Sequence, residues 1–204
     1  MIKVICLVTF IAFTISCGIT NHKRFTFYKQ EFKDEESFRK DGVYFRHKGY
    51  IGGRGDSEFR AELYFFYGDG SFKSINIDVA DSSLEALRSK MTAGLYEELV
   101  FLHISDGAYQ FRGDSLITQI FISTQQRGIY SLDIAEEFFL VNRSQHSIEY
   151  VGSFCKWCPK NKKVNFGKTL IDEHYRFLPL QSKPDSSKFW FKKKKWYKEE
   201  VKFS

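Results

Sequence analysis

The sequence has no apolar segment long enough to cross a membrane as a helix. Its longest apolar run, residues 4–15, has about 12 residues, whereas a helix needs roughly 20 to span a bilayer. Proline is also scarce, with 3 residues, while phenylalanine occurs 22 times and tyrosine 11 times. Aromatic-rich, proline-poor chains favour β-strands, in which large rings pack on a pleated surface. The composition therefore excludes a transmembrane helix and predicts a β-rich fold.

Residues 1–17 have the parts of a secretory signal. Lys3 precedes the apolar run, and the small residue Ser16 comes directly before Cys17. A charged start, a short apolar stretch and a small residue at the cut are the marks of such a signal. Because a cysteine follows the cut, the segment resembles the signal of bacterial lipoproteins, which implies that Cys17 becomes the first residue and carries acyl chains such as palmitate. A cleaved signal without lipid is the alternative, since Thr14 stands where lipoproteins usually have leucine.

Four segments are expected along the chain. They are a signal peptide (1–16), a lipid-anchored tether and lead-in (17–40), a β-rich domain (41–180) and a basic, aromatic tail (181–204). Cleavage of the signal leaves 188 residues, which is enough for one domain with a substantial core.

The net charge of +6 is a mild excess of basic residues. The tail holds much of it, in Lys192, Lys193, Lys194, Lys195 and Lys198. Basic runs bind nucleic acid or anionic lipid, and an exported chain does not meet nucleic acid. We therefore expect no nucleic-acid partner, and we interpret these lysines as a solvated or headgroup-facing surface.

Alternation of apolar and polar residues dominates from residue 41 onwards. Every second residue from Phe59 to Tyr67 is apolar, the pattern of a half-buried strand, and residues 68–70 (Gly-Asp-Gly) then predict a hairpin turn. One helix is predicted over about 82–102, from a capping box of Ser82 and Glu85 followed by a leucine and methionine stripe. The other expected strands are 72–79, 108–112, 115–123, 128–134, 137–142, 147–151 and 173–178.

Short strands separated by turn signals are typical of an antiparallel barrel or sandwich and not of a βαβ fold. Up-and-down connectivity is expected because short turns join consecutive strands. A closed barrel of eight or nine strands would also leave no exposed edge. The predicted fold class is mainly β, an antiparallel barrel or meander sheet with one helical insertion.

Several stretches carry a resemblance to a known family. They are Asp41-Gly42-Val43-Tyr44, residues 63–70 (Leu-Tyr-Phe-Phe-Tyr-Gly-Asp-Gly), residues 107–117 (Gly-Ala-Tyr-Gln-Phe-Arg-Gly-Asp-Ser-Leu-Ile) and Tyr175-Arg176-Phe177, together with Cys17. With these stretches the chain resembles the small lipocalin-like lipoproteins of Bacteroidetes. The resemblance covers most of residues 1–178 and implies a lipocalin-like barrel, but it offers no catalytic residues. The insertion over 81–105 departs from a plain meander.

Two cysteines remain after the signal and the lipidation site are set aside. Cys155 and Cys158 are close in sequence, and in an oxidising compartment such a pair is most simply a small-loop disulfide. Free or redox-active thiols and a metal half-site are the alternatives. No histidine follows Cys158, which excludes c-type haem attachment, and zinc would need two more ligands, for which His146 and His174 are candidates only by elimination. We therefore predict a disulfide and expect no metal or cofactor.

Residues 113–116 spell Gly-Asp-Ser-Leu, the motif of a family of serine esterases and lipases. In such enzymes the serine is a nucleophile, and a base lies within hydrogen-bond reach of it. The base comes from an Asp-x-x-His near the C-terminus, whereas Asp172-Glu173-His174 is one residue short. The chain also has no glycine or asparagine block suited to an oxyanion hole. We therefore interpret the four residues as a hairpin turn, and catalysis by Ser115 is the third hypothesis.

The leading hypothesis is a non-enzymatic, membrane-anchored envelope lipoprotein. A barrel lined with phenylalanine and tyrosine would bind a small apolar ligand if its own side chains do not fill it. The alternative is a structural or accessory subunit of an envelope complex, with an envelope protein as its partner. Residues 18–23 lack the acidic cluster that resembles a surface-export signal, so we expect the outer membrane with the domain facing the periplasm.

Overall fold

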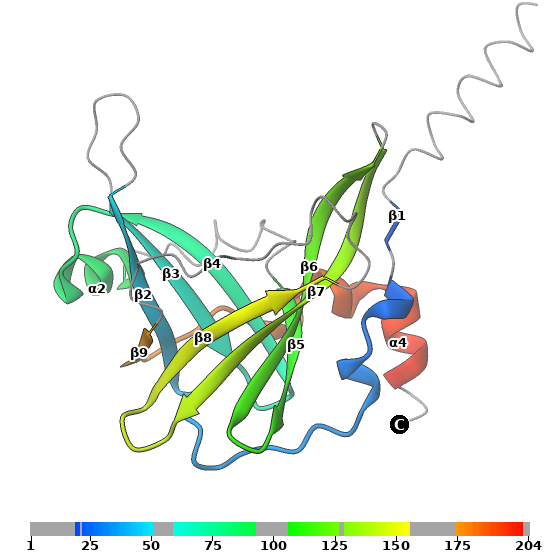
Figure 1. Cartoon of the computed structure of the whole chain (residues 1–204), viewed down its shortest axis with the longest axis horizontal. Helices are drawn as coiled ribbons and strands as arrows, with labels where there is room; N and C mark the ends of the chain where they lie inside the picture. Colours follow the sequence, from blue (N-terminus) through cyan, green and yellow to red (C-terminus); the bar gives the residue numbers. More distant parts are fainter. Residues whose placement is uncertain are drawn as a thin grey trace, which may run out of the picture.

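Eight antiparallel strands close a barrel in the computed structural model of this chain (Figure 1). The structure describes residues 19–20, 22–50, 59–92, 106–126, 129–155 and 174–201. The strands are β1 (Ile19–Thr20), β2 (Gly42–Tyr50), β3 (Phe59–Phe66), β4 (Ser71–Val79), β5 (Asp106–Arg112), β6 (Ser115–Gln126), β7 (Ile129–Asn142), β8 (Ser147–Phe154) and β9 (His174–Pro179). The helical elements are α2 (Leu84–Thr92), α4 (Lys195–Val201) and the 3-10 turns η1 (His22–Arg24), η2 (Phe27–Lys29), η5 (Ser186–Lys188) and η6 (Trp190–Lys193).

The strands follow one another around the barrel in chain order. The order β7-β6-β5-β4-β3-β2-β9-β8 closes because β8 also pairs with β7. Strand β2 meets β9 with Gly42 opposite Pro179, and the short β1 pairs in parallel with β7 at Ser131 and Leu132. The predicted mainly β, up-and-down antiparallel barrel of lipocalin-like form is confirmed.

Two hairpin turns depend on glycines in the left-handed backbone region. Gly70 has φ +76° between β3 and β4, and Gly113 has φ +61° between β5 and β6. L-residues with a side chain adopt this region at a cost, which glycine avoids. The turns that the sequence predicted at both places are therefore present. The strands expected over 128–134 and 137–142 instead form one continuous strand, β7, which pairs with β6 from Ile129 to Leu140.

Aromatic rings fill the interior at the end of the barrel where the hairpin turns lie. Phe38, from the lead-in, is only 2% exposed and stacks on Tyr44 with ring centroids 4.9 Å apart. Phe32 lies against Gly70, where a Cβ would come within 2.7 Å of the phenylalanine ring. The remaining core members here are Tyr64, Phe66, Phe72, Tyr109, Leu116, Phe139, Ile148 and Tyr175. This end of the barrel is closed by packed side chains.

The outer face of β2, β3 and β4 is also buried, so β3 is not half-buried as predicted. Residues Ala61 to Phe66 are all buried, because α2 covers one face of the strand and the barrel interior covers the other. Leu87 and Met91 of α2 pack into this outer core, as the predicted stripe requires.

The predicted capping box of Ser82 and Glu85 is wrong by one residue. Ser83 is the N-cap, since its Oγ accepts a hydrogen bond from the Ala86 N–H at 3.0 Å. Glu85 therefore stands one position too early to complete the box. The rest of the helix predicted over 82–102 lies outside the described residues.

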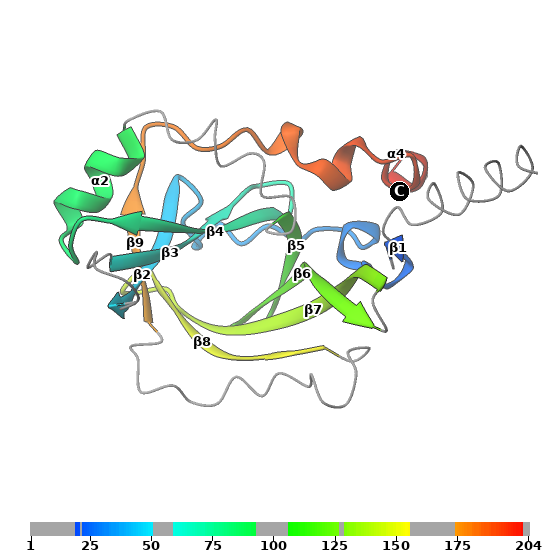
Figure 2. The same cartoon turned by 90° about the horizontal axis from the view of Figure 1, so that it is seen from above.

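The two ends of the described chain pack together on the outer face of β5, β6 and β7 (Figure 2). Phe25 and Phe27 meet Phe189, Trp190 and Phe191, and all five side chains are buried. We call residues 22–29 and 186–198 the terminal layer. The sequence placed these segments in a lead-in and a tail outside the β-rich domain. Their described parts instead complete its core, because rings at these positions find apolar partners on the sheet.

Candidate functional site

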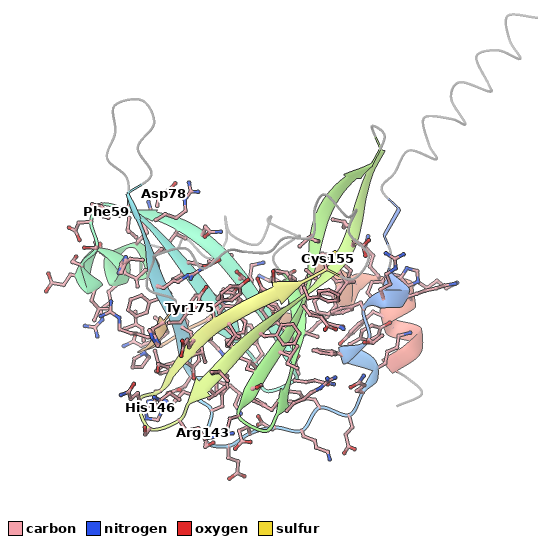
Figure 3. The ribbon with its side chains drawn as sticks, viewed as in Figure 1. Phe59, Asp78, Arg143, His146, Cys155 and Tyr175 are labelled. Atoms are coloured by element: carbon pink, nitrogen blue, oxygen red, sulfur yellow. The ribbon has the colours of Figure 1, made fainter. Side chains whose placement is uncertain are left out.

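The rings packed around Phe38 at the closed end of the barrel form what we call the aromatic plug. Charged and hydrogen-bonding side chains gather in the interior next to it, and Tyr64 and Tyr175 belong to both groups. Figure 3 shows Tyr175 between Asp78 at one end of the barrel and Arg143 at the other. We call the group the inner polar cluster. Its members come from six of the eight barrel strands and are Arg46, Glu62, Tyr64, Thr118, Glu137, Tyr150 and Tyr175.

Glu62 is the centre of one half of the inner polar cluster. Its Oε2 accepts hydrogen bonds from Arg46 Nε at 2.9 Å and from the Tyr175 hydroxyl at 2.7 Å. The Arg46 guanidinium also lies over the Tyr175 ring at 4.7 Å and 5.7 Å from the Tyr150 ring. Glu62 is only 8% exposed, so its charge is compensated by a guanidinium and a phenol and not by bulk water.

Burial and neighbouring charges fix the protonation states in this half. Burial and the charge of Glu62 raise the pKa of Tyr175 well above its usual value. Burial raises the pKa of Tyr150 to about 12. Burial acts to lower the pKa of Arg46, but Tyr175 and Glu62 outweigh it and hold that pKa above its usual value. At neutral pH the phenols are therefore hydrogen-bond donors and the guanidinium is charged.

Glu137 forms the other half of the cluster, on the opposite wall. Its Oε2 accepts hydrogen bonds from the Tyr64 hydroxyl at 3.0 Å and from Thr118 Oγ1 at 3.1 Å. Strands β3 and β7 are not neighbours in the sheet, so the bond from Tyr64 to Glu137 crosses the interior. Burial, and then the charge of Glu137, raise the pKa of Tyr64 well above its usual value.

The interior becomes more exposed on the side of the cluster away from the aromatic plug. Asn76 lies opposite Glu62 in the sheet register, so it faces the interior, yet its side chain is exposed. One register step further, Arg60 and Asp78 form an exposed ion pair at 3.0 Å. Along β3 and β4 the interior therefore changes from packed rings, through the inner polar cluster, to solvated polar residues.

The inner polar cluster was not predicted from the sequence. Alternation along β3 predicts that its apolar positions face the core, whereas the other face, with Glu62 and Tyr64, lines the interior. The one available signal was a tyrosine between glutamate and phenylalanine on the polar face of the strand. Partners such as Tyr175 are far away in the sequence, so alternation alone does not reveal them.

Ser115 is the first residue of β6 and lies opposite Arg112 in the predicted hairpin. His174 begins β9 and lines a surface hollow of about 410 Å³ together with Asp114 and Arg143. Ser115 is not among the residues that line this hollow. Asp172 and Glu173 lie outside the described residues. The expected serine and histidine therefore share no pocket in the described part of the chain.

The lipidation site Cys17 and the whole predicted signal lie outside the described residues. Cys155 is buried and disulfide-bonded. Cys158 lies outside the described residues, so the predicted pairing of these two cysteines stays a prediction. His146 lies in the turn between β7 and β8, with φ +47°, apart from Cys155 (Figure 3). Within the ranges that the structure describes, no three histidine, cysteine, aspartate or glutamate side chains gather as metal ligands.

The aromatic residues of the predicted tail have mainly structural roles. Trp190 is buried on Phe121, with ring centroids 4.7 Å apart. Trp196 is half-buried, stacks on His22 at 5.0 Å and contacts Tyr28 at 5.5 Å. A second hollow, of about 240 Å³, lies beside these rings and is lined by Phe27, Tyr28, Gln30, Phe32, Asp69, Gly70, Ser71, Ala108, Tyr109, Phe191 and Tyr197.

No helix among the described residues is long and apolar enough to cross a membrane. Comparisons with models of protein families, with curated protein sequences and with solved structures gave no match for this chain. The resemblance to lipocalin-like lipoproteins of Bacteroidetes therefore stays a prediction.

Proposed function

We propose that this protein is a membrane-anchored envelope lipoprotein that binds a small amphiphilic molecule inside its barrel. The observation that carries the proposal is the inner polar cluster. A barrel that serves only as a scaffold is most stable with an apolar interior, because buried charges lose their hydration and well-packed apolar groups often replace them without loss. Ligand sites, in contrast, combine apolar walls with a few placed polar groups, as this interior does.

The cluster indicates which part of the ligand would lie deepest. Two carboxylates, one guanidinium and three phenols offer both donors and acceptors next to the aromatic plug. Beyond them, on the wall formed by β6 and β7, lies a small apolar group made of Ala135, Ile120, Ile122 and Cys155, the residue that follows β8. A molecule with a polar head toward the cluster and an apolar body toward Ile122 matches this order. We therefore propose an amphiphilic ligand in place of the purely apolar one expected from the sequence.

The anchoring part of the proposal rests on residues 1–17. The charged start, the apolar run and Cys17 support export and acylation of this cysteine. Two or more acyl chains bind a bilayer firmly, since each buried CH2 contributes about 0.8 kcal/mol. The protein would act at the membrane as a carrier or a sensor of the bound molecule and not as an enzyme.

A second candidate is the accessory subunit with a filled barrel. Leu140, Val151 and Phe154 are about half exposed on neighbouring strands β7 and β8. Exposed apolar side chains that cluster on one surface are typical of protein contacts. In that case the inner polar cluster would be a structural network without a ligand.

The test compares native with denaturing mass spectrometry of the protein purified gently from an exporting bacterial host. We expect a denaturing mass that shows cleavage before Cys17 and covalent acyl chains. The native mass should include a further adduct that is lost on denaturation. Glu137→Gln should reduce this adduct, while Asp69→Asn, which breaks an ion pair outside the barrel, should retain it. Native and denaturing masses that agree in repeated preparations would refute ligand binding and favour the accessory subunit.

A further inference from the structure

Positive charge is concentrated in the two ends of the chain that form the terminal layer. Residues 22–31 hold three basic residues and one acidic residue, and residues 181–204 hold eight lysines and three acidic residues. Residues 32–180, which include every barrel strand from β2 to β9, hold 19 basic and 21 acidic residues. The barrel is therefore close to neutral, and the excess charge of the folded chain lies at its ends.

The fold brings these two ends to one surface. His22 stacks on Trp196 at 5.0 Å, and Tyr28 packs on Tyr197 at 5.1 Å. The basic side chains of the terminal layer that are exposed are Lys23, Lys29, Lys188, Lys193, Lys194, Lys195 and Lys198. Lysines that are 170 residues apart in the sequence thus form one basic surface.

Two further basic residues of the terminal layer form ion pairs with the barrel. Arg24 pairs with the buried Asp133 at 2.7 Å, and Lys192 pairs with Asp69 at 2.6 Å. These two ion pairs fasten both ends to the barrel. The layer therefore has inward-facing cations that hold it in place and exposed lysines on its outer side.

The point where the chain enters the fold lies beside this surface. Strand β1 is hydrogen-bonded to β7 next to η1 and α4 (Figures 1 and 2). Cys17 comes only two residues before Ile19, and two extended residues reach at most about 7 Å. An acyl chain on Cys17 would hold β1, and the surface next to it, against the lipid headgroups. The link between the acylated residue and the folded chain would then be only about two residues long, and not the 24 residues predicted over 17–40.

We propose that the exposed lysines of the terminal layer form a docking surface for a bilayer of anionic phospholipid. Each lysine close to an anionic membrane contributes about 1 kcal/mol of binding free energy, so several together give measurable affinity without an acyl chain. Docking there fixes the orientation of the barrel on the membrane. The orientation rests on the proposed acylation of Cys17, whereas the affinity for anionic lipid does not.

The test uses vesicle flotation of the chain from residue 17 onward, with Cys17→Ser so that no acyl chain contributes. Vesicles contain either phosphatidylcholine alone or phosphatidylcholine mixed with phosphatidylglycerol. We expect binding only to the mixed vesicles, and weaker binding at high salt because exposed charges are screened. The triple variant Lys193→Glu, Lys194→Glu, Lys198→Glu should bind at least about 100-fold more weakly.

A control variant carries the same change of charge on other surfaces. Lys33, Lys90 and Arg112 are exposed outside the terminal layer, and their replacement by glutamate should leave most of the binding intact. Circular dichroism and denaturation check that both variants fold. Equal loss in the two triple variants, or equal binding to both kinds of vesicle, would overturn the proposal. If the protein purified from the exporting host carries no acyl chains while the Cys17→Ser chain still binds the mixed vesicles, the proposed anchor is refuted and the docking surface is supported.

Discussion

Replacing Lys73 by methionine tests how the C-terminal segment is held on the barrel. Lys73 Nζ lies 2.6 Å from Asp106 Oδ1, and both side chains are 2% exposed. The Trp190 N–H donates to Asp106 Oδ2 at 3.2 Å, and Lys73 lies 5.4 Å from the Phe189 ring. The pair thus lies between the sheet and the terminal layer, out of reach of water.

The expected loss of stability depends on whether a substitution leaves a buried charge without its partner. Lys73→Met leaves the carboxylate of Asp106 buried without its cation, which costs about 3–5 kcal/mol. The double variant Lys73→Met, Asp106→Asn removes both charges and keeps an acceptor for the Trp190 N–H. The double variant should therefore regain most of the lost stability, with a free energy of unfolding within about 2 kcal/mol of that of the original chain.

Urea denaturation of the original chain, both single variants and the double variant gives the four free energies of unfolding. Proteolysis of the native proteins, read at residues 186–198, reports whether the terminal layer has detached. If the single variants prove too unstable to purify, the double variant alone still tests the argument. The reasoning would be refuted if Lys73→Met lowers the free energy of unfolding by less than about 1 kcal/mol, or if the double variant is no more stable than the two single variants.

Three further predictions concern single positions. Ser83→Ala should lower the free energy of unfolding by about 1 kcal/mol through loss of the helix cap, whereas Ser82→Ala should change it by less than about 0.5 kcal/mol; denaturant titration of both separates the observed cap from the predicted one. Burial lowers the pKa of His47 below the ordinary histidine value of about 6.5, so the unfolded chain binds the proton more readily and the free energy of unfolding should fall as the pH drops below about 6.5. His47→Gln should flatten this slope in denaturation midpoints taken from about pH 7.5 to about pH 5, and an unchanged slope would contradict the assignment. Gly107→Ala would place a Cβ 2.2 Å from a backbone oxygen of β6 and should cost about 2 kcal/mol or more, whereas Gly68→Ala, with open space around it, should be nearly neutral in the same assay.

Local features of this chain were predictable because they depend on neighbours in the sequence. The hairpin at Gly70 needs only alternating strands and a residue that tolerates positive φ, and both are visible in the sequence. The same holds for the hairpin at Gly113. Up-and-down order follows from a series of such hairpins. The fold class was therefore accessible from local patterns.

The direction in which each strand face points was not predictable. On β3 the face with Glu62 and Tyr64 looks like a solvent face, because it alternates with apolar residues. It lines the interior because Tyr175 and Glu137, from distant strands, satisfy its polar groups. Similarly, Phe25 and Trp190 looked like parts of loose ends, since the sheet surface that buries them is formed by other segments. Long-range partners decide both cases.

Closure of the barrel sets the order in which this chain can fold. The seam joins Gly42 to Pro179, and the terminal layer needs Phe189 and Trp190, so neither can form before the last part of the chain is available. Contacts between such distant residues make folding slow, and the C-terminal residues are the last to leave the ribosome. A nascent chain of this kind stays open during synthesis and can be threaded through a translocation pore. If the chain is exported as we propose, the late seam would keep it open enough to pass through the pore.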